Sequence, residues 1–305
     1  MSAPMNLVAY LARAGVGSRR ACDELVQSGA VTVNGEVVTF PRHKVEASDV
    51  VAVGGETVTP HTLRYVLVNK PRGVASTRRD PHADRVIVDL VPEGRTLFPV
   101  GRLDVDTTGL IILTNDGVLA NRLMHPRYGV QKTYSVRVRG KVTKRVLACL
   151  RQGVVLEDGV TAPAEVTLRK QSAKTALVDL TIHEGRKRQV RRMFQALDLP
   201  VEDLHRRRYG PLSDKGLSPG GFRELGGDDV ESLRRAGEDV SAAVAGEVQG
   251  DPVSLAAPEA AVLAAPEAAV LTVPDAAAAG EMAPPVAPET SATHEPPAEP
   301  GGDAG

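Results

Sequence analysis

The sequence predicts an α+β protein with a small N-terminal domain, a larger domain containing a mixed or antiparallel sheet, and a disordered tail. Residues 4–60 combine two short helical patterns with a hairpin signal. Residues 62–236 carry strand-like runs joined by hairpin-length connections, without regular strand–helix alternation. Residues 240–305 are rich in Ala, Pro and Glu and are too poor in large apolar residues to build a core.

The small domain is predicted to begin with two helices and a hairpin. The apolar positions of its first helical face are Leu7, Tyr10, Leu11 and Ala14. Ser18 is placed to cap a second helix. Asn34-Gly35 stands between two short valine-rich runs, which predicts a two-residue β-hairpin. Two helices and a hairpin within about fifty residues form a compact α+β module.

The larger domain contains five strand-like runs of β-branched and apolar residues: Tyr65–Val68, Leu110–Leu113, Thr133–Val138, Ala164–Leu168 and Ala176–Ile182. Helical spacing predicts one helix around Leu147, capped by Thr143, and another around Val190. Asp228 followed by Glu231 predicts a capping box that opens a last short helix.

The charge is distributed unevenly along the chain. Residues 241–305 contain ten acidic residues and no Lys or Arg. The other 28 acidic residues and all 37 basic residues lie in residues 1–240, which therefore carry a net charge of about +9. An excess of this size favours a polyanionic partner over a small neutral substrate, although a merely soluble basic protein fits the charge equally well.

Several classes of protein are disfavoured by simple patterns. No apolar run approaches the roughly 20 residues needed to cross a bilayer, and the N-terminus lacks the features of a signal peptide. Cys22 and Cys149 lie far apart in helix-like stretches, so a disulfide framework is not expected. The seven histidines show no metal-ligand spacing. We therefore expect a cytoplasmic, metal-free monomer without a membrane partner.

The acidic tail contains an imperfect repeat, because residues 257–263 and 265–271 both read APEAAVL. Its recurrent prolines would interrupt any helix. We expect this tail to be disordered. An alternative is that its negative charge shields the basic part of the chain and weakens non-specific binding to polyanions.

The small domain also carries a candidate phosphate site. Arg19 and Arg20 fall at the start of the second predicted helix, where free N–H groups and cations together favour phosphate. Residues 11–38, LARAGVGSRRACDELVQSGAVTVNGEVV, resemble the S4 RNA-binding domain, although Asn6 stands where that family usually has a basic residue. The alternative is a helical appendage with incidental arginines. We interpret the domain as RNA-binding.

The most distinctive segment is FPVGRLDVDTTGLIILTNDG at residues 98–117. Asp104 lies in a loop that leads into a buried strand, a common place for catalytic groups. Arg102, two residues away, could favour the ionised carboxylate. The local pattern leaves three interpretations open: a turn-forming residue, a Mg²⁺ site shared by Asp104, Asp106 and Asp116, or covalent or base chemistry.

Five segments in order resemble one family: VNKPRGVAST (68–77), GRLD and its surroundings (100–117), HPRYGVQKTYSVRVRG (125–140), HEGRKRQVRRMF (183–194) and RYGPL (208–212). Together they are similar to the RsuA/RluB branch of pseudouridine synthases, which joins an S4 domain to an α+β catalytic domain. The resemblance covers about residues 5–235. It implies a cofactor-free enzyme that isomerises a uridine in ribosomal RNA, with large-subunit RNA favoured over small-subunit RNA.

The resemblance also implies roles for individual residues. Asp104 corresponds to the essential aspartate of the family, acting as nucleophile or as base. Tyr134 corresponds to the tyrosine that packs against the target base, although ordinary sheet packing would also explain it. Arg191 is expected to pair with the catalytic carboxylate. Lys70 and Pro71 belong to the motif that supports the floor of the active site.

We assign further basic residues to RNA contact: Arg19, Arg20, Arg102, Arg186, Lys187, Arg188 and Arg192. Lys187 stands where relatives often have Asn. The run from residue 186 to residue 192 begins a predicted helix, and a solvated helix face is the alternative. Two rival functions are a non-catalytic RNA-binding assembly factor and a metal-dependent nuclease using the aspartates.

Overall fold

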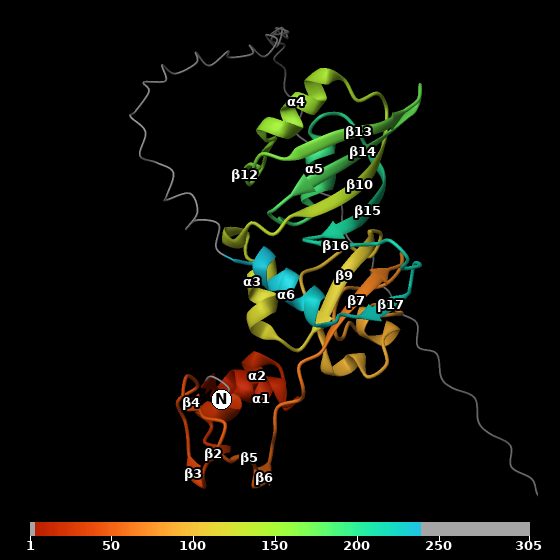
Figure 1. The fold of residues 1–305 in the computed structure, drawn as a ribbon. Helices are drawn as coiled ribbons and strands as arrows, with labels where there is room; N and C mark the ends of the chain where they lie inside the picture. Colours follow the sequence, from red (N-terminus) through yellow and green to blue (C-terminus); the bar gives the residue numbers. More distant parts are fainter. Residues whose placement is uncertain (1–3, 239–305) are drawn as a thin grey trace, which may run out of the picture. The chain divides into compact units, whose positions relative to one another are not determined.

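The computed structural model describes residues 4–238 of the chain (Figure 1). The predicted disordered tail, residues 240–305, and its shielding role lie outside the described residues. Helices and strands are mixed along the described part, as expected for an α+β protein. Between residues 4 and 238, no helix has the length and apolar character needed to cross a membrane.

The N-terminal domain has the predicted helices and hairpin. Its helices are α1 (Leu7–Arg13) and α2 (Arg19–Gln27). The hairpin turns at Asn34-Gly35, where both residues have positive φ angles, 53° and 85°, as this kind of tight turn requires. The short strands are β1 (Met5–Asn6), β2 (Val31–Val33), β3 (Glu36–Val37), β4 (Lys44–Val45), β5 (Val51–Val53) and β6 (Glu56–Thr57).

Side chains cap both helices of this domain. Ser18 Oγ accepts a hydrogen bond from the N–H of Ala21 at 3.2 Å, as predicted for α2. Asn6 Oδ1 accepts from the N–H of Val8 at 3.1 Å, so the residue that departs from the family pattern begins α1. The apolar helix faces and the hairpin share one core formed by Leu7, Leu11, Cys22, Val26, Val31, Val33, Val45 and Val51.

The larger domain is built on one nine-stranded sheet (Figure 1). Seven strands follow the order β13, β14, β10, β15, β9, β7, β17, while β16 pairs with β15 and β8 with β9. The strands are β7 (Tyr65–Lys70), β8 (Phe98–Pro99), β9 (Thr108–Thr114), β10 (Lys132–Arg139), β13 (Glu165–Gln171), β14 (Thr175–Ile182), β15 (Val201–Tyr209), β16 (Leu212–Ser213) and β17 (Phe222–Glu224).

All five predicted strands are present in this sheet. Its pairings are antiparallel except for the contact between β9 and β15, so the sheet is mixed. That parallel contact is short and pairs His205 with Thr108 and Arg206 with Gly109. A Cβ on Gly109 would lie 2.4 Å from the carbonyl oxygen of Arg206, so only glycine allows β15 to approach here.

Two pairs of helices pack against different strands of the sheet. Apolar residues of α4 (Lys144–Gln152) and α5 (Gln189–Gln195) share a core with β10, β13 and β14. Those of α3 (Gly117–Met124) and α6 (Gly227–Ala236), which lie side by side in Figure 1, share a core with β7 and β9. A two-stranded hairpin, β11 (Val155–Leu156) and β12 (Gly159–Val160), follows α4.

One predicted cap forms and one does not. Thr143 Oγ1 accepts from the N–H of Val146 at 3.3 Å and begins α4, as predicted. The capping box predicted for Asp228 and Glu231 is wrong. The last helix begins two residues earlier than predicted, with Gly226 as its N-cap, so Asp228 lies inside the first turn and forms no capping hydrogen bond.

Candidate active site

The loop that carries Asp104 joins β8 to β9 and is held through its backbone. We call residues 101–107 the carboxylate loop. Ser76 Oγ donates to the carbonyl oxygen of Leu103 at 2.8 Å and accepts from its N–H at 3.1 Å. The N–H of Thr107 donates to the carbonyl oxygen of Asp104 at 3.0 Å, closing the turn. These bonds fix the backbone without using the Asp104 carboxylate.

Lys70, at the end of β7, supports the same loop from the interior of the domain. The side chain is fully buried (0% exposed). Its Nζ donates to the carbonyl oxygens of Pro71 at 3.0 Å, Val74 at 2.9 Å and Val105 at 3.3 Å. Burial lowers the pKa of Lys70 to about 8, while the two carboxylates of the loop act to raise it. This position suits the supporting role expected for Lys70 and Pro71.

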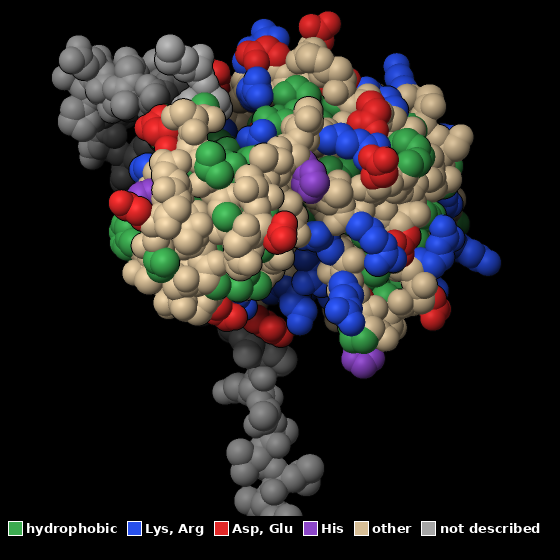
Figure 2. Space-filling view, turned by 90° about the horizontal axis from the view of Figure 1, so that it is seen from below, with side chains coloured by type: hydrophobic (Ala, Val, Ile, Leu, Met, Phe, Trp, Pro, Cys, Tyr) green, Lys and Arg blue, Asp and Glu red, His purple; other side chains and the backbone are tan. Residues whose placement is uncertain are grey.

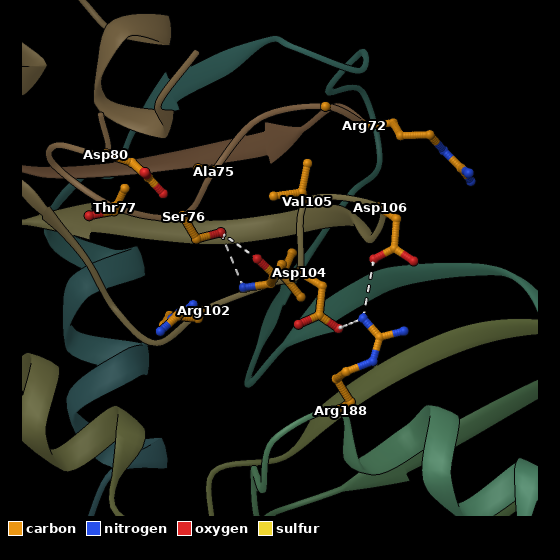
Figure 3. Close-up of a pocket in the computed structure, with 12 residues that line it drawn as sticks. Arg72, Ala75, Ser76, Thr77, Asp80, Arg102, Asp104, Val105, Asp106 and Arg188 are labelled. Carbon is orange, nitrogen blue, oxygen red and sulfur yellow. Dashed lines mark hydrogen bonds and ion pairs between the residues drawn. The ribbon is translucent and has the colours of Figure 1, made fainter. Parts of the chain in front are cut away.

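The Asp104 side chain is 35% exposed and pairs with a different arginine from the one expected. Arg188 Nη1 lies 3.6 Å from Asp104 Oδ2 and 4.0 Å from Asp106 Oδ1 (Figure 3). Arg191 Nη2 instead lies 2.8 Å from Asp106 Oδ2. The predicted pair between Arg191 and Asp104 is therefore wrong in this structure, and Arg188 takes its place. Arg102 lies apart from the Asp104 carboxylate (Figure 3).

The backbone explains why Arg188 reaches the carboxylates. Arg188 precedes α5 as its N-cap and has a left-handed conformation with φ of 50°. Residues other than glycine rarely adopt this conformation, and when they do the strain is often found at functional sites. Helical periodicity could not predict the left-handed conformation of Arg188, because this residue lies just before the first residue of the helix.

The basic residues before and within α5 differ in their partners. We call residues 183–188 the arginine loop. Arg186 donates to the carbonyl oxygens of Asp158, Gly159 and Val160 at 3.1, 3.0 and 2.7 Å. Arg192 forms two bonds to the Asp158 carboxylate, at 3.0 and 2.9 Å. Arg186 and Arg192, which we assigned to RNA, thus anchor the arginine loop and α5 to the hairpin of β11 and β12. Lys187 is exposed.

A cavity of about 530 Å³ extends from Asp104 into the domain. Tyr134, on β10, forms part of its wall and is largely buried. Other lining residues are mainly apolar or basic: Leu103, Ile182, Val190, Leu204, Lys132, Arg188, Arg206 and Tyr209. An aromatic ring and apolar side chains next to one carboxylate suit a planar base whose sugar faces Asp104.

Three residues of this cavity were missed by the sequence analysis. Lys132 and Arg206 are buried and lie on neighbouring strands, as does Tyr209. Burial raises the pKa of the Tyr209 hydroxyl, which donates to the carbonyl oxygen of Leu123 at 3.1 Å. The motif RYGPL contained Tyr209, but only the pairing of β10 with β15 brings these side chains together.

A second hollow, of about 610 Å³, adjoins Asp104 on the outer side of the carboxylate loop (Figure 3). Arg72, Arg102 and Arg188 line it together with Ser76 and Asp80. Arg102 is exposed, and Arg72 forms an ion pair with Asp203 at 2.7 Å. Arginines at this position could contact phosphates on either side of a nucleotide held at Asp104.

The aspartates are not arranged as a metal site. Asp116 caps α3, accepting from the N–H groups of Val118 and Leu119 at 3.0 Å each, and also accepts from the hydroxyl of Tyr65 at 2.8 Å. Within residues 4–238, no group of three or more His, Cys, Asp or Glu side chains is placed to hold a metal ion. The interpretation of Asp104, Asp106 and Asp116 as a shared Mg²⁺ site is therefore wrong.

The predicted phosphate site of the small domain has the expected local geometry. Arg19 and Arg20 are the first two residues of α2, directly after its N-cap Ser18, and both are exposed. Free N–H groups of the first helical turn and two cations are thus presented at the same helix end.

Comparisons with known proteins agree with this arrangement of domains. Residues 64–196 match the family described as RNA pseudouridylate synthase, and residues 5–51 match the S4 domain. "Ribosomal large subunit pseudouridine synthase B" of Bacillus subtilis is 46% identical over 234 residues, covering 75% of this chain and 95% of that protein. The protein of the same name from Haemophilus influenzae is 40% identical over 238 residues, covering 75% and 67%.

A solved structure described as "Crystal structure of pseudouridylate synthase" is also similar. It is 32% identical, has a TM-score of 0.55, and covers 75% of this chain and 99% of its own. The family matches include the S4 domain, the strands β7 to β14 and the loop that carries Asp104. The chain therefore belongs to the family of RNA pseudouridine synthases that carry an N-terminal S4 domain.

Proposed function

We propose that this protein converts a specific uridine of large-subunit ribosomal RNA to pseudouridine, with Asp104 as the acting carboxylate. The observation that carries this proposal is the position of Asp104 at the mouth of a cavity whose wall contains Tyr134. The cavity volume of about 530 Å³ lies in the range of roughly 300–1,000 Å³ that is typical of sites for small ligands. The similar proteins named for large-subunit RNA support the choice of substrate.

The reaction breaks the bond between N1 of uracil and C1′ of ribose and rejoins the base through C5. Asp104 either bonds to C1′ or removes a proton from the ribose, and both roles need an ionised carboxylate. Arg188 Nη1 lies 3.6 Å from Asp104 Oδ2, so the cation borders the carboxylate that would react. The target base must leave its stack to enter the cavity, and contact with Tyr134 compensates part of the loss, roughly 1–3 kcal/mol per stacked base.

RNA affinity is divided between two surfaces in this proposal. Arg19 and Arg20 of the S4 domain contact phosphates at a distance from the reacting base. Arg102, Lys187 and Arg188 contact phosphates near Asp104, because they are exposed and surround the cavity or the adjoining hollow. Lys and Arg side chains are gathered on part of the face shown in Figure 2, with fewer Asp and Glu among them.

The first experiment maps pseudouridine on unmodified transcripts of Bacillus subtilis large-subunit and small-subunit ribosomal RNA. The protein is incubated with each transcript, and carbodiimide-dependent stops of primer extension are compared with those given by Asp104→Asn. We expect one new stop on the large-subunit transcript and a loss of activity of roughly 10²–10⁴-fold in the variant. Asp80→Asn is the matched control, because Asp80 lines the adjoining hollow without facing the cavity.

Each part of the proposal has its own contrary outcome. A stop that persists undiminished with Asp104→Asn would remove Asp104 from the chemistry. A stop on the small-subunit transcript alone would contradict the proposed substrate. No stop on either transcript, despite tight binding, would favour the assembly-factor interpretation.

A second experiment tests the division of affinity. The double variant Arg19→Ala/Arg20→Ala should bind the RNA more weakly, and the slope of its affinity against salt concentration should be smaller by roughly 1–2. Its rate at saturating RNA should equal that of the wild type. A lower rate at saturation would show that the two arginines do more than contact phosphate.

A further inference from the structure

Lys132 on β10 and Arg206 on β15 are two buried cations that have no assigned role in the proposed reaction. Lys132 is 7% exposed and Arg206 is 2% exposed. The two side chains flank the ring of Tyr209, with Lys132 Nζ 5.6 Å and Arg206 Cζ 4.9 Å from the ring centre. Both line the same cavity as Asp104 and Tyr134.

Neutral groups account for the contacts of both cations. Lys132 Nζ donates to the carbonyl oxygens of Val130 at 3.1 Å and His183 at 3.5 Å. Arg206 Nε donates to the carbonyl oxygen of Leu110 at 2.6 Å, and its Nη1 donates to the Tyr134 hydroxyl at 3.3 Å. Arg206 Nη2 is buried without a partner within residues 4–238. Neither cation forms an ion pair with a carboxylate of those residues.

An uncompensated buried charge is unfavourable for folding, because the ion loses its hydration without gaining an opposite charge. Burial and the nearby Arg206 accordingly lower the pKa of Lys132 to about 8. Two such cations on adjacent strands therefore add positive charge at the buried wall of the cavity, beside Tyr134 and Tyr209. A bound group that becomes negative during the reaction would be stabilised there.

The isomerisation creates such a group. When the N1–C1′ bond breaks, its electron pair stays with the uracil, which becomes an anion delocalised over N1, O2 and O4. Asp104 meets the electron-deficient ribose, either by bonding to C1′ or by taking a proton from C2′ that it later returns. After the base turns, C5 bonds to C1′, the ring loses the proton on C5 and gains one on N1, so that the product is an isomer of the substrate.

We infer that Lys132 and Arg206 stabilise the negative charge of the uracil between breakage of its bond to ribose and formation of the new carbon–carbon bond. This inference rests on the proposed function. It assigns the charges that develop on the ribose and on the base to two different sets of residues. The carboxylate of Asp104 faces the positive charge that develops on the ribose, and the two cations border the space in which the base turns. Their field acts on the free base in any orientation, which a single directed hydrogen bond would not.

The test compares uridine with 5-fluorouridine at the target position under single-turnover conditions. Fluorine makes uracil a more stable anion, so breakage of the glycosidic bond depends less on help from the protein. The substrate is a transcript of the modified RNA segment, and the readout is the disappearance of the target nucleoside after digestion. We expect Lys132→Met to slow the reaction of uridine by on the order of 100-fold and that of 5-fluorouridine by no more than about 10-fold.

The control is Lys70→Met, the same substitution at another buried lysine. Lys70 does not line the cavity, and its Nζ bonds to the carbonyl oxygen of Val105 in the carboxylate loop and to that of Val74 beside it. Losing it should slow both substrates by the same factor, because misplacement of Asp104 is independent of the leaving base. Arg206→Gln is a second test that removes the charge and keeps hydrogen-bond donors, and it should show the same dependence on fluorine as Lys132→Met.

The outcomes separate this inference from the proposed function. If the wild type modifies neither substrate, the proposed function has failed before any variant is compared. If the wild type is active and Lys132→Met and Arg206→Gln slow both substrates equally, the cations have a purely structural role and the inference is wrong. Thermal unfolding of each variant identifies any that does not fold, and a folded member of the pair then decides the question.

Discussion

The two loops that face each other at the active site are held in place in different ways. The carboxylate loop (101–107) is fixed by hydrogen bonds to its backbone from Ser76 and Lys70, both buried. The arginine loop (183–188) is fixed by side chains, chiefly through Arg186 at the hairpin of β11 and β12 and through Arg192 with Asp158. The first loop is held by donors that are themselves buried, whereas the second is held by partly exposed arginines that bond both to carbonyl oxygens and to the Asp158 carboxylate.

The two kinds of contact restrain the two loops to different degrees. Hydrogen bonds to backbone atoms position the Asp104 backbone while leaving its carboxylate available to the substrate. Ion pairs at the surface are weakened by salt and contribute little to stability individually. The arginine loop, with its proposed RNA contacts, can therefore adjust to a polyanionic partner, whereas the backbone that carries the candidate carboxylate of Asp104 stays in a fixed position. Disturbing the carboxylate loop should reduce catalysis, and disturbing the arginine loop should alter mainly salt-dependent properties.

Among substitutions of the residues that support the two loops, the largest effect is expected from Lys70→Met. The substitution leaves the carbonyl oxygens of Pro71 and Val74 without their buried donor, at about 1–3 kcal/mol for each unsatisfied group. The carbonyl oxygen of Val105 loses the Lys70 bond and keeps the one from the N–H of Gly73 at 2.9 Å. Displacement of the carboxylate loop by about 1 Å should lower the rate of isomerisation by roughly 100-fold. Denaturant unfolding and single-turnover kinetics measure the two effects. An unchanged rate would show that Lys70 does not position Asp104.

The same lysine predicts a pH dependence of stability. Lys70 has a pKa of about 8 in the folded chain, compared with an ordinary value of 10.5. Between these values the unfolded chain binds a proton that the folded chain does not, so the contribution of Lys70 to the free energy of unfolding rises with pH. The stability advantage of wild type over Lys70→Met should therefore grow from pH 7 to pH 10, by at most about 3 kcal/mol. An advantage that shrinks over this interval would contradict the lowered pKa.

A smaller effect is expected from Ser76→Ala. The hydroxyl makes both hydrogen bonds to Leu103, and its loss should lower the free energy of unfolding by about 1–2 kcal/mol. Because Lys70 still holds the loop, the rate should fall by roughly 10-fold. Thr77→Ala is the neighbouring control, since its hydroxyl bonds, among residues 4–238, to the backbone of Arg79 alone, and it should leave the rate unchanged. Equal rates for Ser76→Ala and wild type would mean that the hydrogen bonds of Lys70 are sufficient to position the carboxylate loop.

The smallest effect is expected from Asp158→Asn in the arginine loop's anchor. The Asp158 pKa lies below its usual range, chiefly because Arg192 donates hydrogen bonds to it, and the variant loses this ionic contact at neutral pH. We expect a slight loss of stability that disappears at high salt, and an unchanged rate at saturating RNA. Thermal unfolding at low and high salt checks this. A large loss of rate would show that the two loops are held in equivalent ways.

Much of the fold follows from local patterns in the sequence. Alternating and helical spacing identified the two N-terminal helices, the Asn34-Gly35 hairpin and five strands of the sheet, because these elements depend on neighbours a few residues away. The GRLD motif and its resemblance to a family selected Asp104 and Tyr134 as candidates. The capping box that was wrongly predicted at Asp228 shows the limit, because the residue at which a helix begins depends on local backbone geometry, and here that residue is Gly226.

The tertiary structure alone decided which charges meet. The left-handed backbone at Arg188 turns its side chain toward Asp104, so that Arg191 pairs with Asp106 instead. The pairing of Tyr134 with Arg206 across β10 and β15 brings a buried cation to the cavity. Such contacts depend on strand register and chain reversal between distant segments, and a pattern of neighbouring residues carries no information about either. The sequence by itself determined the two N-terminal helices, five of the nine strands of the large sheet and the candidate carboxylate, because these depend on local patterns and motifs. The fold determined the partners of that carboxylate.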